Sequence, residues 1–146
     1  MFFSSFIFLT NVINNFFHGD YIYSLLFLIL FFTSILHHYC CETWTNYLDK
    51  MPIIGIISYG GWLYYKKLEA NLIGSSNVSI AYVPVICFYL TVFLYLYGDI
   101  TDQYCFHKEY EIANTYHALI HVISSIGHNG FIIVVLYPNE FLWQYF

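Results

Sequence analysis

The sequence predicts an all-α protein: a polytopic membrane bundle of about five transmembrane helices, forming a single domain over residues 1–146. Hydrophobic residues make up 60% of the chain, and Asp, Glu, Lys and Arg only 9%, against roughly 25% charged residues in an ordinary soluble domain. Long charge-free runs recur along the whole chain instead of marking a single anchor. A helix crosses the hydrocarbon layer in about 20 residues, so the length leaves almost no room for a soluble domain.

The first two helices are expected over 2–17 and 21–41, separated by Gly19 and Asp20. The second is the clearest, because its centre is as apolar as any transmembrane sequence. The first is the weakest, and we expect it to cross the membrane only as a short or tilted helix. Three polar residues interrupt it, namely Asn11, Asn14 and Asn15.

The remaining helices are expected over 51–67, 78–97 and 114–136. Pro52 suits the opening turn of the third helix, where the missing N–H would be unpaired anyway. Pro84 is expected to kink the fourth helix. The third helix also carries small residues that let a neighbouring helix approach closely, and these are Gly55, Gly60 and Gly61.

The charge balance excludes several function classes. Four lysines, no arginine and nine acidic residues leave no basic patch for nucleic acid or for anionic lipid headgroups. The cysteines show no CxxC or paired spacing, so we interpret them as buried free thiols; they are Cys40, Cys41, Cys87 and Cys105. The oligomeric state is not indicated by any of these features.

Seven histidines are notable in a chain with so little charge. Burial of an ionisable side chain in a membrane costs free energy, so such residues usually have a function. His117 and His121 lie one turn apart on the last helix, and Ser34 and His38 share this spacing on the second. An i,i+4 histidine pair is a common metal-chelating geometry. With one helix between the third and the last, His38, Asp49 and the histidine pair come to the same side of the membrane.

Three imidazoles around Zn²⁺ leave one tetrahedral position for water, which is the open arrangement of catalytic zinc. The ion lowers the pKa of such a water towards about 7. Asp49 is then placed to orient the water or accept its proton, and Ser34 to donate a hydrogen bond to the water or the developing oxyanion. These residues predict metal-assisted hydrolysis of an amide or ester in a lipid-like substrate.

Simpler interpretations exist for each residue alone. A single intramembrane histidine more often makes a hydrogen bond between helices than a metal bond. Asp49 also suits a helix N-cap, and Ser34 a hydroxyl that bonds within its own helix. His37 points about 100° away from its neighbour and is interpreted as interfacial. His128 lies about 10 Å beyond the last histidine pair, which is too far for the same mononuclear site.

Three segments together carry a resemblance to a known family. Residues 34–38, 49–52 and 117–127 resemble the Ser-x3-His, Asp-x2-Pro and His-x3-His signatures of alkaline ceramidases. These enzymes belong to the CREST superfamily of seven-helix membrane hydrolases, which includes the PAQR receptors. Residues 31–40 are also similar to the corresponding segment of the myomaker-type branch. The order and spacing of the three motifs is specific, whereas one motif alone is weak.

The resemblance implies a zinc ion bound by His38, His117 and His121, with Asp49 and Ser34 as catalytic residues. It also implies hydrolysis of a membrane lipid amide such as ceramide, in the membrane of the endoplasmic reticulum or the Golgi. One departure is evident, because only one helix fits between the third and the last, where the seven-helix family has three. We therefore expect a reduced form of that bundle.

Two other function classes remain open on the sequence. The first is a non-catalytic zinc-binding membrane protein of the myomaker type. The second is a small electron-transfer membrane protein in which His38 and either His117 or His121 hold a b-type haem. A haem needs only two histidine ligands. Haem binding would therefore leave the positions of Ser34 and Asp49 relative to the histidines unexplained.

Overall fold

The computed structural model describes residues 2–40, 42–69 and 78–136, and in these ranges all regular secondary structure is helical. The predicted all-α class is therefore confirmed. In chain order the elements are η1 (Phe2–Ile7), α1 (Phe8–Phe17), α2 (Tyr21–Cys40), α3 (Thr43–Glu69), α4 (Val78–Val92), the π-helix η3 (Phe93–Tyr97), α5 (Gly98–Thr101), η4 (Tyr104–Phe106) and α6 (Tyr110–Leu136).

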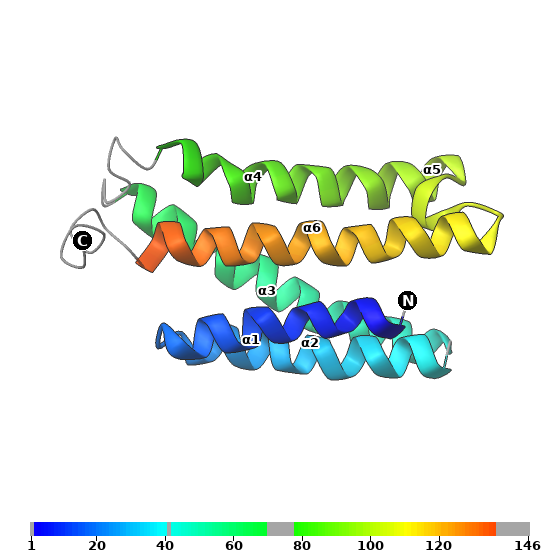
Figure 1. Ribbon diagram of the computed structural model, residues 1–146, viewed down its shortest axis with the longest axis horizontal. Helices are drawn as coiled ribbons and strands as arrows, with labels where there is room; N and C mark the ends of the chain where they lie inside the picture. The colour runs from blue at the N-terminus through cyan, green and yellow to red at the C-terminus, as the bar shows by residue number, and fades with distance from the viewer. Residues whose placement is uncertain (1, 41, 70–77, 137–146) are drawn as a thin grey trace.

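Helix α6 lies in the middle of the molecule, with α4 on one side and the α1–α2 pair on the other, while α3 crosses obliquely (Figure 1). Helix α4 packs mainly on α6, whereas α3 packs mainly on α2. The hydrophobic core forms where α1, α2, α3 and α6 meet. Its buried members are Phe8, Tyr23, Phe27, Leu30, Phe31, Ile56, Phe131 and Ile132.

The turn between α1 and α2 forms at the two residues that the sequence suggests. Gly19 adopts a φ of +80°, a left-handed conformation that is easily reached only without a Cβ atom. Asp20 follows it and accepts a hydrogen bond from the backbone N–H of Tyr23, at 3.0 Å. This bond satisfies one of the unpaired donors at the start of α2.

Helix α3 begins at Thr43 instead of the predicted Met51, so Pro52 lies inside it and not in its opening turn. The segment before Pro52 is polar but contains neither Gly nor Pro, so nothing in it stops a helix. Thr45 is fully buried, and its hydroxyl donates to the carbonyl of Glu42. Asp49 is consequently a residue of the helix interior and not an N-cap.

The predicted fourth helix continues beyond residue 97, because η3 and α5 prolong α4 without a break (Figure 1). Pro84 lies within α4. The combined helix ends before Asp102, which has a left-handed φ of 53°. Asparagine and aspartate adopt this conformation more easily than most residues other than glycine.

Two of the three glycines in α3 lie at a close approach to α2. A Cβ atom on Gly60 would lie 2.5 Å from the Tyr23 hydroxyl oxygen, and one on Gly55 would lie 3.1 Å from a methyl group of Leu26. A Cβ atom on Gly61 would meet nothing within 4 Å. The expectation of close helix packing is thus confirmed at Gly55 and Gly60 but not at Gly61.

Hydrogen bonds between polar side chains join α1 to α6. Asn11 is fully buried; its amide nitrogen donates to the Ser125 carbonyl at 3.1 Å, and its amide oxygen accepts from the Ser125 hydroxyl at 2.6 Å. Asn14 donates to the side-chain oxygen of Asn129 at 3.0 Å. The asparagines that interrupt the first apolar run thus include the residues that attach this helix to the bundle.

Within the ranges that the structure describes, two helices are long and apolar enough to cross a membrane. They span Tyr21–Cys40 and Ala81–Thr101, with mean hydropathies of 1.6 and 1.7. The apolar helix Phe3–Phe17 is shorter. Association with a membrane is thus consistent with the lengths and compositions of these helices.

We expect Asn11→Ala to lower the free energy of unfolding by on the order of 1 kcal/mol, because it removes two buried hydrogen bonds between α1 and α6. Thermal or denaturant unfolding in detergent micelles measures the change. Ile13→Ala is the matched control, since Ile13 is on the same helix with 55% of its side chain exposed. An equal or larger loss in the control would argue against the importance of these hydrogen bonds.

Candidate metal centre

Three histidines from α2 and α6 converge at one end of the molecule. His38 lies near the end of α2, and His117 and His121 lie in the first half of α6. Both helix ends are at the right-hand end of the molecule in Figure 1. The nearest ligand atoms of the three side chains all lie within 4.8 Å of one another. His121 is buried and the other two are half-buried. The structure thus brings together the three residues that the sequence predicts as metal ligands.

The rings of the cluster adopt different orientations. Ring centroids are 5.0 Å apart for His38 and His117, 5.6 Å for His38 and His121, and 4.9 Å for His117 and His121. The two α6 rings are inclined by 71° to each other. Three imidazoles in such an arrangement supply the donor set of a catalytic zinc site, which binds the metal through three protein ligands. The three residues could therefore hold a metal ion, and the donor set is one that Zn²⁺ accepts.

His121 is oriented by the N-terminal segment. Its Nδ1 atom forms a hydrogen bond with the Ser4 hydroxyl, at 3.0 Å, and its ring lies 4.9 Å from the Phe8 ring. With Nδ1 occupied, Nε2 is the nitrogen left to bind a metal. Hydrogen bonds of this kind set the tautomer and ring orientation of metal-binding histidines.

The two predicted catalytic residues are not part of the converging group. Ser34 is 1% exposed and shares a hydrogen bond of 2.9 Å with Ser5. Asp49 is half-buried and accepts a hydrogen bond of 3.1 Å from the Thr33 hydroxyl. Ser34 lies about one turn before His38 on α2, and Asp49 of α3 bonds to the residue that precedes Ser34. Their catalytic roles remain predictions.

The other two histidines of these helices have different partners. His37 forms a hydrogen bond of 3.2 Å with the Thr45 hydroxyl of α3. His128 forms one of 2.6 Å with the Tyr23 hydroxyl. Neither belongs to the group whose ligand atoms converge, as their positions on the helices predicted.

The contribution of the first segment to the site was not predicted. Ser4 and Phe8 contact His121, and Ser5 contacts Ser34. A signal was present in the sequence, because polar residues recur at helical spacing through this apolar run. The polar residues Ser4, Asn11 and Asn15 lie on one face of a helix.

Comparisons of this chain with known proteins show no relative. No protein-family model matches the chain, and no curated protein or solved structure matches it at a significant level. The case for a metal centre therefore rests on the convergence of three imidazoles in this structure.

We expect the purified protein to bind one zinc ion per chain, and His38→Ala, His117→Ala or His121→Ala to abolish stoichiometric binding. Each substitution removes one of the three ligands. Metal analysis by mass spectrometry gives the stoichiometry. His37→Ala is the control, because His37 neighbours the cluster but bonds to Thr45. Stoichiometric zinc retained by all three variants would refute the site.

We expect Ser4→Ala to weaken zinc binding by about 10- to 100-fold, the usual cost of losing a residue that orients a metal ligand. Competition with a zinc chelator measures the affinity. Ser5→Ala provides the comparison, since Ser5 bonds to Ser34 and not to a histidine. Equal affinities of the two variants would show that Ser4 does not act through His121.

Proposed function

We propose that the protein is a zinc-dependent intramembrane hydrolase that cleaves a lipid amide such as ceramide. The observation that carries the proposal is the convergence of His38, His117 and His121 within a bundle of apolar helices. The motifs that resemble alkaline ceramidases support the type of reaction. The same resemblance suggests the endoplasmic reticulum or Golgi as the compartment.

A bundle of five transmembrane helices is supported by the distribution of polarity. Buried side chains include many polar ones, among them Ser5, Asn11, Asn15, Ser24, Thr33, Ser34, Thr45, His121 and Ser125. Large apolar side chains are exposed on every long helix, for example Phe17, Ile22, Phe32, Ile54, Ile86, Tyr89, Phe93 and Ile126. Apolar surface of this extent is rare on soluble monomers, whereas polar contacts between helices suit the interior of a membrane bundle.

The proposed chemistry assigns distinct tasks to the residues at this end of the bundle. The three histidines would hold the ion, and Ser4 orients the ring of His121. Bound zinc supplies a water of lowered pKa and polarises a carbonyl group. Asp49, anchored by Thr33, is the proposed proton acceptor. Ser34 is the proposed hydrogen-bond donor to the developing oxyanion.

The position of the site suits a lipid amide. The histidines lie toward one end of α2 and α6, so an amide near the membrane surface would meet the polar cluster while its acyl chain lies among apolar helices. Such a substrate keeps its hydrocarbon part out of water during cleavage. The amide, and not the chain, would then be the group that the site recognises.

We expect the zinc-loaded protein to release fatty acid from ceramide, and His121→Ala and Asp49→Asn to reduce this rate by at least about 100-fold. Asp49→Asn removes the proposed general base, a loss that typically has this effect, and His121→Ala removes a proposed metal ligand. Fatty acid release is measured by mass spectrometry in mixed micelles. Asp99→Asn is the control, because Asp99 is an exposed acid.

The alternatives are distinguished by two further results. Stoichiometric zinc without fatty acid release would favour a non-catalytic protein of the myomaker type. A Soret band in the absorption spectrum would favour a haem protein and contradict the zinc assignment.

A further inference from the structure

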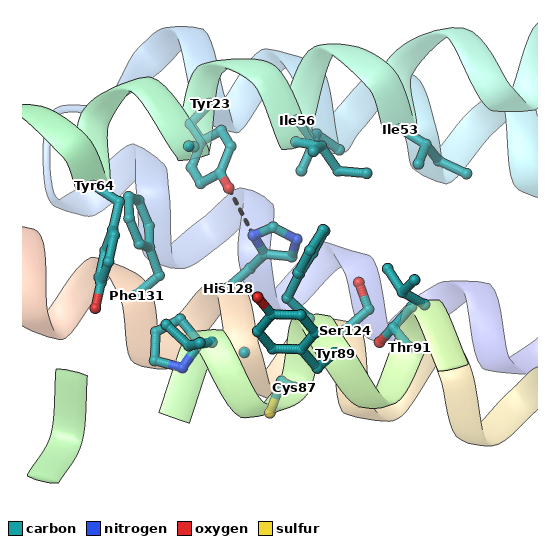
Figure 2. Close-up of a pocket in the computed structure, with 18 of the residues that line it drawn as sticks. Tyr23, Ile53, Ile56, Tyr64, Cys87, Tyr89, Thr91, Ser124, His128 and Phe131 are labelled. Atoms are coloured by element: carbon teal, nitrogen blue, oxygen red, sulfur yellow. Dashed lines mark hydrogen bonds between the residues drawn. The ribbon is translucent and has the colours of Figure 1, made fainter. Parts of the chain in front are cut away.

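A second site lies along α6, in a cavity of about 340 Å³. Residues of α2, α3, α4 and α6 line it, most of them apolar, and Figure 2 shows His128 and Tyr23 at its wall. On α6 the lining runs from Ser124 to Phe131, a length of about 10 Å. The Tyr64 hydroxyl, also in the lining, donates to the Ala81 carbonyl at 3.0 Å and links α3 to α4.

The ring of His128 is held in place by its neighbours. Its Nδ1 atom is 2.6 Å from the hydroxyl oxygen of the fully buried Tyr23. The Phe27 ring lies 5.1 Å from the His128 ring, at 69° to it. Gly60 leaves the space that the Tyr23 hydroxyl occupies. His128 is therefore a fixed polar group in the wall of the cavity.

The second ring nitrogen of His128 points away from Tyr23 (Figure 2). Within the described ranges, the hydrogen bonding of this ring is with Tyr23 alone. In a neutral imidazole one nitrogen carries hydrogen and the other a lone pair, so Nε2 is either a donor or an acceptor. A polar atom in apolar surroundings costs free energy until it gains a partner.

This site is separate from the metal centre. His128 follows His121 by two turns, about 10 Å along α6. Two aromatic rings stand between them: Phe8 lies 4.9 Å from His121 and 6.4 Å from Phe27, which contacts His128. No member of the histidine cluster lines the cavity. Occupation of the cavity therefore does not require a bound metal.

We propose that this cavity binds a neutral hydrocarbon chain that carries a hydroxyl group, and that the hydroxyl bonds to Nε2 of His128. The apolar walls of the cavity favour a hydrocarbon chain as the ligand. The described lining contains no Lys, Asp or Glu to pair with a charged ligand. A hydroxyl both donates and accepts, so it satisfies Nε2 in either tautomer. The inference goes beyond the proposed hydrolase and does not depend on it.

The test compares two ligands that differ by one atom: a long-chain methyl ester with a mid-chain hydroxyl group, and the same ester without it. Affinities are measured on the full-length protein in lipid nanodiscs. We expect the hydroxylated ester to bind about three- to tenfold more tightly, the value of one hydrogen bond. His128→Phe should abolish this preference, and Tyr23→Phe should reduce it.

Thr91→Val is the matched control, because Thr91 also lines the cavity but its hydroxyl oxygen is almost completely buried. This variant should keep the preference. Equal affinities of the two esters for the wild type, no binding of either ester, or a preference that persists in His128→Phe would overturn the proposal.

A measurement on the wild type keeps the test valid if His128→Phe does not fold. The ¹⁵N resonance of His128 Nε2 should shift with the hydroxylated ester and not with its partner; the same response to both would contradict the proposal. Both measurements are repeated after removal of metal with a chelator, and we expect no change. Because no hydrolysis is scored, failure here is distinct from failure of the hydrolase proposal.

Discussion

Hydrogen bonds between buried polar side chains are the interaction on which the rest of the structure depends. Much of the outer surface is apolar, so burial of hydrophobic area alone does not determine how these helices pair. Asn11 and Ser125 satisfy each other between α1 and α6, and Ser5 and Ser34 do so between the first segment and α2. An unpaired polar group in such surroundings is costly, so these contacts specify which helix faces meet. Once they form, Ser4 lies against His121.

Helix α6 carries two histidine sites on related faces, and their surroundings give them different chemistry. His121 belongs to a group of three imidazoles, which is a donor set for a metal. His128, two turns further, bonds to a tyrosine hydroxyl and lines an apolar cavity. Phe8 and Phe27 separate the two. The same type of side chain thus joins a group of converging imidazoles in one place and bonds to a tyrosine hydroxyl in an apolar cavity wall in the other.

Sequence patterns predicted some elements closely. Helix α2 matches its prediction within one residue. A long apolar run that begins directly after Gly19 and Asp20 determines where this helix starts. The start of α3 was predicted too late, since polar residues were interpreted as a loop although nothing among them breaks a helix. The asparagines of α1 were interpreted as a weakness of the helix. Asn11 and Asn14 bond to α6, and a hydropathy value takes no account of such partners.

By itself the sequence determined the all-helical class and the spacing that sets two histidines one turn apart, because both follow from local periodicity. It also indicated that His38 belongs with His117 and His121, through motif order and the alternation of helices. Only the tertiary structure decided that one ligand atom from each of the three rings lies within 4.8 Å of the others, that Ser4 bonds to one of the rings, and that Tyr23 bonds to His128. These contacts join segments more than 75 positions apart in the chain. Their geometry depends on how closely helices approach, as at Gly60, and no local pattern encodes that distance.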